Sequence, residues 1–222
     1  MYFAINRPRP DLPDLIRQEV GALRATHTDV PINILALVDG AFDEQFFSQR
    51  SRTSLQGISL YQGTVLAALG SAAPYLLRGP AHMGKEQAWL ERLYESCDSK
   101  PMLSIIASTL DVEAMSRHLR PFLIAITDDS LEWPIRWGDT RVQPHLLAAL
   151  TEVQRDQLLQ PMHKWWSAER DGELISWSGT ARTIAAVPMF DKLPISDEEF
   201  ALLVDQAEAD AVLTQIEETQ PD

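Results

Sequence analysis

Two nearly continuous apolar runs constrain the fold of this chain most strongly. The first is INILALVDG, from Ile32 to Gly40, and the second is PMLSIIAS, at residues 101–108. Short runs rich in Ile, Leu and Val, the first of them bounded by proline and glycine, are typical of strands that are covered on both faces. Such strands need other elements packed above and below them. The sequence therefore predicts layers built on a sheet.

Helix-like and strand-like segments alternate along the first part of the chain. Residues 11–24 and 84–97 predict helices, because their apolar residues recur at helical spacing. ISLYQG and PYLLRGP predict short strands, and FLIAI and LEWPIRW predict two strands joined by a polar turn. This order favours an α/β fold with a mixed sheet over a helix bundle or a β-sandwich.

The pattern changes near residue 145. Residues 142–150 and 151–160 predict two short helices, and only a small strand, ELISW, is expected after them. Ser196 and Glu199 have the spacing of a capping box that opens a last helix. We therefore expect an α/β lobe at residues 1–145 and a smaller, mostly helical lobe at residues 146–222.

Charge and composition bear on partners and compartment. The net charge of the 222 residues is −13, and residues 191–222 contain ten acidic residues against one lysine. Binding to a nucleic-acid backbone depends on clustered Lys and Arg, so it is not expected. No apolar segment has the length of a signal peptide or a membrane span, and the single cysteine, Cys97, suits a reducing compartment. We expect a cytoplasmic protein that binds no membrane.

Motifs that carry catalysis or bind cofactors are not found in the sequence. The histidines do not have metal-ligand spacing, and no glycine-rich phosphate loop or G-x-S-x-G turn occurs. Cys97 ends an amphipathic helix on its apolar side, which favours a packed cysteine over a nucleophile. We therefore expect no metal, no cofactor and no enzymatic activity.

The string IRWGDTRV, at residues 135–142, places two arginines around one carboxylate. Asp139 can cap the helix that follows while Arg136 or Arg141 pairs with it. Structural ion pairs collect at such corners, so an ion pair that joins two elements is favoured over an active site.

The adjacent pair Trp165-Trp166 allows two interpretations, since two neighbouring side chains cannot face the same core. One indole is partly exposed and anchors a partner, or each indole fills a different packed cluster.

Five segments, taken in order, resemble the adaptor (chaperone) family of the type VI secretion system, which carries a domain of unknown function. They are ALVDGA with Asp39, SLYQG, APYLL, HLR and the string RWGDTRV with Arg136, Asp139 and Arg141. Thr140 stands where the family usually has proline. The resemblance covers residues 32–166.

The resemblance implies a non-enzymatic protein that binds a toxic effector in the bacterial cytoplasm and helps to load it onto the secretion spike. The effector is then the protein partner, and the spike protein is a second candidate. Two other classes stay open. An immunity-type protein that neutralises a toxin is also small and acidic. A hydrolase or transferase needs a cleft that holds Asp39, Asp139 and Arg141 together.

Interface energy is usually concentrated in a few aromatic or arginine anchors inside a polar rim. The second lobe offers such anchors among acidic residues, and we expect it to contribute to effector binding. The predicted partner-binding residues are Trp165, Trp166, Trp177, Phe200 and Leu203.

Overall fold

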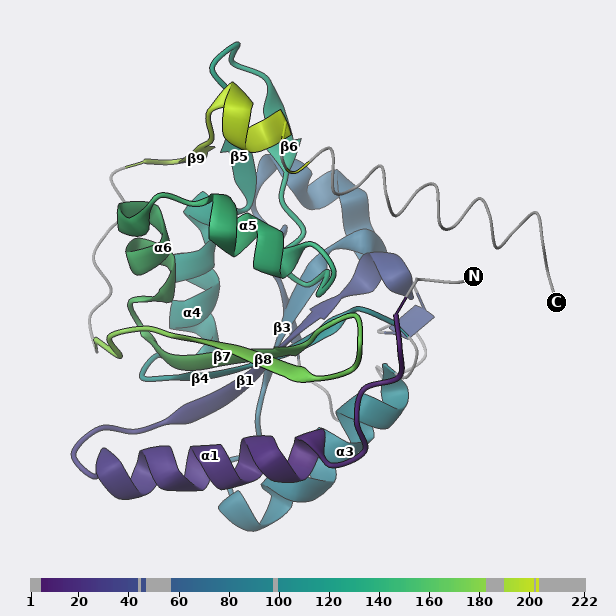
Figure 1. Ribbon diagram of the computed structural model, residues 1–222, viewed down its shortest axis with the longest axis vertical. Coiled ribbons are helices and arrows are strands. Elements are labelled where there is room, and N and C mark those ends of the chain that lie inside the picture. The colour runs from purple at the N-terminus through teal and green to yellow at the C-terminus, as the bar shows by residue number, and fades with distance from the viewer. Residues whose placement is uncertain are drawn as a thin grey trace, which may run out of the picture.

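The structure, a computed structural model, describes residues 5–43, 45–46, 57–97, 100–182, 190–201 and 203. Its centre is a six-stranded sheet with the order β2-β3-β1-β4-β7-β8, and every neighbouring pair is antiparallel (Figure 1). The strands, in chain order, are β1 (Asn33–Asp39), β2 (Gly57–Ser59), β3 (Pro74–Arg78), β4 (Leu103–Ser108), β7 (Met162–Ala168) and β8 (Leu174–Ser178).

A smaller sheet has the order β6-β5-β9. Its strands are β5 (Ile124–Ile126), β6 (Glu132–Pro134) and β9 (Leu193–Pro194). β5 and β6 form the predicted hairpin, and β9 pairs with β5 in parallel. The α/β fold is confirmed, but among the described strands a parallel pair occurs only in this small sheet, and the main sheet is antiparallel.

Helices cover both faces of the main sheet, as the two apolar runs predict. In Figure 1, α1 (Leu12–Thr26) and α3 (Glu86–Ser96) lie below the sheet. Above it lie α4 (Val112–Leu119), α5 (Gln143–Ala149) and α6 (Glu152–Leu159), with the small sheet at the top. Residues 197–201 and 203 are also helical. No described helix is both long and apolar enough to cross a membrane.

Short 3₁₀ segments complete the described elements. They are η1 (Gly40–Phe42), η2 (Val65–Ala72), η3 (Met83–Lys85) and η4 (Arg120–Phe122).

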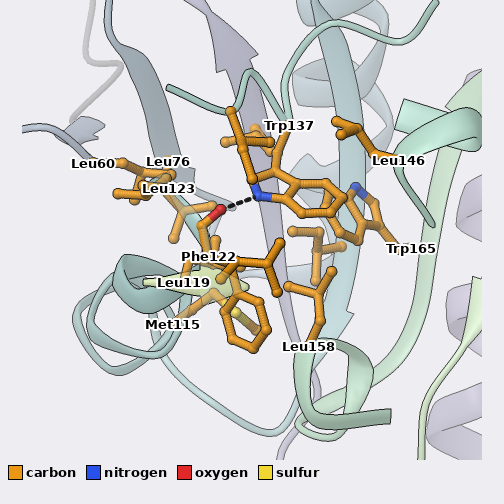
Figure 2. Close-up of a cluster of buried hydrophobic side chains, with 14 of the residues drawn as sticks. Leu60, Leu76, Met115, Leu119, Phe122, Leu123, Trp137, Leu146, Leu158 and Trp165 are labelled. Atoms are coloured by element: carbon orange, nitrogen blue, oxygen red, sulfur yellow. Dashed lines mark hydrogen bonds between the residues drawn. The ribbon is translucent and has the colours of Figure 1, made fainter. Parts of the chain in front are cut away.

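Each face of the sheet belongs to a separate apolar core, because successive strand residues point to opposite faces. Leu35 and Leu37 of β1 belong to the core under α4, α5 and α6, whereas Ala36 and Val38 belong to the core under α1 and α3. Figure 2 shows the first core, in which the indole N–H of Trp137 donates a hydrogen bond of 2.6 Å to the carbonyl of Phe122. That bond satisfies the polar atom of a fully buried tryptophan.

The mostly helical character predicted for residues 146–222 is confirmed for α5 and α6, and the small strand predicted at ELISW is confirmed as β8, but β7 was not predicted. β7 pairs with β4 along its length, and β8 pairs with β7. The expected boundary at residue 145 therefore does not separate the main sheet from the chain that follows. Residues 204–222, the rest of the expected acidic helix, lie outside the described residues.

Candidate functional site

Asp39 ends β1 and is fully buried. Its Oδ1 accepts a hydrogen bond of 3.0 Å from the backbone N–H of Ala41, so the carboxylate caps η1. Its Oδ2 accepts a hydrogen bond of 3.0 Å from Nε of Arg136, which lies 97 residues further along the chain. The end of the central strand is therefore fixed to the segment that follows β6.

Asp139 lies just before α5 and is 2% exposed. Arg141 donates to its Oδ1 from the backbone N–H and from Nε, both at 3.1 Å, and to its Oδ2 from Nη2 at 2.9 Å. This bidentate arrangement is the strong form of an arginine–carboxylate pair. The predicted pairing of Asp139 with an arginine is confirmed, and Arg141 is the direct partner.

Arg136 connects the two carboxylates. While its Nε donates to Asp39, its Nη1 lies 3.8 Å from Oδ2 of Asp139. Its guanidinium carbon is 4.6 Å from the ring centroid of Phe42, and that of Arg141 is 5.2 Å from the same ring. Both distances are within the range of cation–π attraction. We call the four charged residues, Asp39, Arg136, Asp139 and Arg141, the ion-pair junction.

Two glycines allow the backbones at the ion-pair junction to come close together. A Cβ atom at Gly138 would lie 2.8 Å from Cβ of Asp39, and one at Gly40 would lie 2.2 Å from the carbonyl oxygen of Ser71. These glycines are needed for close approach.

Burial is the main influence on the pKa of Asp39 within the ion-pair junction. It raises the pKa of Asp39, while the charge and hydrogen bond of Arg136 and the N–H of Ala41 act against that rise, and the nearby Asp139 adds to it. Burial and the charge of Asp39 also raise the pKa of Tyr61 to about 12. Both carboxylates are occupied by arginine and closed to solvent, so the arrangement joins elements and leaves neither Asp39 nor Asp139 open to a substrate. Among the described residues, no group of three or more His, Cys, Asp or Glu is placed to hold a metal ion.

All five segments of the family resemblance lie next to one another in the fold. Residues 36–39 pair with residues 74–77 across β1 and β3, and Ser59 and Leu60 bond to β3 on its other side. Arg120 donates to the carbonyl of Gln62 at 3.3 Å, which brings in residues 118–120. The ion-pair junction adds residues 136–142.

His118 is a structural histidine at this place. Its side chain is buried, and its Nε2–H donates to the carbonyl of Leu158 at 2.9 Å. Burial lowers its pKa.

The tryptophan pair fills two separate cores. Trp165 packs 6.0 Å from Trp137, between ring centroids, and its indole donates to Oγ of Ser104. Trp166 faces the other core and donates to Oε2 of Glu19 at 3.0 Å. Both indoles are fully buried. The prediction that they anchor a partner is therefore wrong, and the alternative of one tryptophan in each cluster is confirmed.

The remaining predicted partner-binding residues reach the surface only in part. Trp177, Phe200 and Leu203 are half-buried and pack against the core above the sheet. Trp133 was not predicted as a site residue, yet it is 41% exposed and its ring centroid lies 4.8 Å from that of Phe200. Its alternation with Leu131 after the polar turn TDDS is the sequence signal that indicates an exposed apolar side of the hairpin.

The fold and the ion-pair junction define a mixed α/β protein in which the buried carboxylate at the end of the central strand pairs with Arg136. A family model described as Domain of unknown function (DUF4123) matches residues 34–157, and the chain belongs to that family. The matched range contains all four residues of the ion-pair junction. Comparison with curated proteins and with solved structures finds no match.

Proposed function

We propose that this protein is a non-enzymatic adaptor, or chaperone, which binds a toxic effector of a type VI secretion system and helps to load it onto the secretion spike. The observation that carries the proposal is family membership over residues 34–157, taken with the resemblance of five segments to the adaptors of that system. The effector is the protein partner, and the bacterial cytoplasm is the place of action.

The geometry of the ion-pair junction supports a structural role for the most distinctive of these segments. Asp39 and Asp139 are neutralised by Arg136 and Arg141 and are closed to solvent. A buried ion pair of this kind contributes to a defined fold and offers no free acid or base. In an adaptor, such a frame supports binding surfaces elsewhere on the molecule.

An immunity-type protein is the second candidate, and the acidity of the chain favours it. The ten acidic residues among residues 191–222 suit a protein that covers a basic groove of a toxin. The two candidates differ in what happens to the partner: an adaptor leaves the toxin active and exports it, whereas an immunity protein inhibits it.

The test combines capture of the partner with secretion. The tagged full-length chain is purified from a bacterium that is secreting through this system, and stoichiometric partners are identified by mass spectrometry. The gene is then deleted, and the culture medium is analysed for the captured protein and for the tube protein of the system. The adaptor proposal expects the captured protein to disappear from the medium while the tube protein is still released. Unchanged secretion of the captured protein, or inhibition of its activity by the purified chain, would contradict the proposal.

A further inference from the structure

An exposed apolar surface lies where β6 of the small sheet meets the short helix at residues 197–201. It consists of Leu131, which is 52% exposed, Trp133, which is 41% exposed, and the half-buried Phe200. We call these three residues the hairpin patch. Figure 1 shows the short helix that carries Phe200 next to β6.

The hairpin patch is held in place by the fold. Leu131 and Trp133 are two residues apart, so they point to the same side of the hairpin. The rings of Trp133 and Phe200 are tilted by 35° and lie in contact, and Phe200 also packs against the core. β6 is the last strand of its sheet among the described strands, so its outer edge has no strand beside it there. A tryptophan that is packed on one side and open on the other is the usual form of an interface anchor.

Carboxylates surround the hairpin patch. Residues 126–134 and 190–201 contain seven acidic residues and one lysine, Lys192, which pairs with Glu132. Six of the seven acidic residues are exposed, and one of these, Glu132, is the partner of Lys192. Four of the others form what we call the acidic rim: Asp128, Asp129, Asp197 and Glu198.

The two halves of the acidic rim are joined. The backbone N–H of Asp197 donates to Oδ2 of Asp128 at 3.3 Å, so the rim is continuous from the hairpin to the helix. Hydrogen bonds from the Thr127 hydroxyl and the Leu131 N–H lower the pKa of Asp129. Asp129 is therefore ionised at neutral pH.

We infer that the hairpin patch and its acidic rim form a docking surface for a basic, partly apolar segment of a protein partner, one in which Arg or Lys stands next to an aliphatic or aromatic side chain. The apolar side chain packs beside Trp133, an arginine of the segment stacks on the exposed indole, and neighbouring cations pair with the rim. The inference rests on the proposed function, since it names the surface and the chemistry through which the effector binds.

The charge of the acidic rim favours a basic protein segment over a second copy of this chain or a nucleic acid. A second copy of the chain brings the same acidic rim, and like charges placed together oppose association. A nucleic acid is repelled for the same reason. A basic segment removes the repulsion among the rim carboxylates and is attracted at a distance.

The first experiment measures peptide binding to the full chain. The probe is a fluorescein-labelled peptide that alternates arginine with leucine and tryptophan, and its counterpart has glutamate in place of each arginine. Nitrogen-15 NMR spectra identify the indole signal of Trp133 by its loss in Trp133→Phe. We expect the basic peptide to shift that signal and the acidic peptide to leave it unchanged. Binding of both peptides with equal affinity, or shifts that spare Trp133, would overturn the inference.

Matched variants separate the hairpin patch from general charge effects. Trp133→Ala and the pair Asp128→Lys with Glu198→Lys should each weaken binding of the basic peptide roughly tenfold or more. Glu95→Lys reverses an exposed charge on α3, on the opposite face of the sheet, and Val65→Ser removes an apolar side chain that is 78% exposed outside the hairpin patch. Both controls should bind as the unchanged chain does. Glu95→Lys changes the net charge by two and the pair by four, so a loss of binding free energy in Glu95→Lys that is half that of the pair would show that net charge alone attracts the peptide, and the inference would fail.

The second experiment repeats effector capture in the secreting cell with the same variants. Loss of the effector from Trp133→Ala and from the charge-reversed pair, with retention by both controls, supports the docking surface. Full capture and export by the patch variants would overturn the inference and leave the adaptor function standing. Peptide binding at Trp133 by a chain that captures no effector would count against the adaptor function and leave the surface standing.

Discussion

Replacing Asp139 by alanine is expected to lower the free energy of unfolding by about 3–5 kcal/mol, because it breaks a buried ion pair and leaves the other charge behind. Asp139 is 2% exposed and accepts three hydrogen bonds from Arg141, whose side chain is 15% exposed. Since this guanidinium still reaches some solvent, we expect a loss of about 3 kcal/mol, at the lower end of the range. For a chain of this length the melting temperature would fall by about 6–12 °C.

Urea denaturation of the purified variants measures this loss, with the midpoint and the slope reported together. The matched control is Glu113→Ala, which breaks the ion pair between Arg78 and Glu113, whose side chains are 59% and 49% exposed. An exposed pair contributes about 0–1 kcal/mol. The double variant Asp139→Ala with Arg141→Ala removes both charges and should recover part of the stability. If Asp139→Ala is no less stable than Glu113→Ala, the ion-pair junction does not stabilise the fold as its geometry implies.

Four further predictions follow from the described contacts and from the sequence. Gly138→Ala should cost about 1–3 kcal/mol in the same denaturation assay, because its Cβ would lie 2.8 Å from that of Asp39; a neutral outcome would show that the backbone yields easily. Burial, with a smaller contribution from His27, lowers the pKa of His163 from its ordinary 6.5, so the folded state binds protons less readily than the unfolded chain. The contribution of neutral His163 to the free energy of unfolding should therefore be fully present above pH 6.5 and should be lost as the pH falls below that value. His163→Gln should make this pH dependence shallower. An unchanged pH profile in the variant would show that other groups cause the dependence. Deleting residues 191–222 removes the buried side chains of Leu193 and Ile195, each of which stabilises the folded state by about 1.5–3 kcal/mol through burial. The deletion should therefore lower the melting temperature, and an unchanged melting curve would contradict this prediction. Elemental analysis of the purified protein should find no stoichiometric metal, and one equivalent of zinc or iron would contradict the prediction from histidine spacing.

Local patterns predicted most elements because those patterns arise from burial along one segment. The apolar run at residues 32–40 contains β1, and its alternate residues fill two cores. The pairing of Asp139 with an arginine was also predictable, since Arg141 is only two residues away. The link from Arg136 to Asp39 spans 97 residues, and no local pattern indicates it.

β7 shows why part of the sheet was missed. Its sequence MHKWWSA contains a histidine, a lysine and a serine beside the tryptophans, so it lacks the continuous apolar run of β1. Lys164 is only partly exposed in the sheet because it pairs with Glu19 of α1, which also accepts the indole N–H of Trp166. The glutamate that makes this strand compatible with burial is 145 residues away. The direction of the strands depends in the same way on long-range pairing.

The two charged regions of the molecule differ in how far their charges are neutralised, and this difference locates the expected binding activity. At the ion-pair junction, two carboxylates pair with two arginines and are removed from water. Their charges therefore interact within the fold and are not open to a partner. At the acidic rim, four exposed carboxylates belong to the same two segments as the exposed Trp133, and the one lysine of residues 126–134 and 190–201 pairs with Glu132. Exposed charges of one sign raise the rate of association with a partner of opposite charge. This increase in rate becomes smaller at higher salt, because salt screens the charges. Binding of a basic partner through the hairpin patch should therefore weaken as ionic strength rises, while the stability conferred by the ion-pair junction should change little.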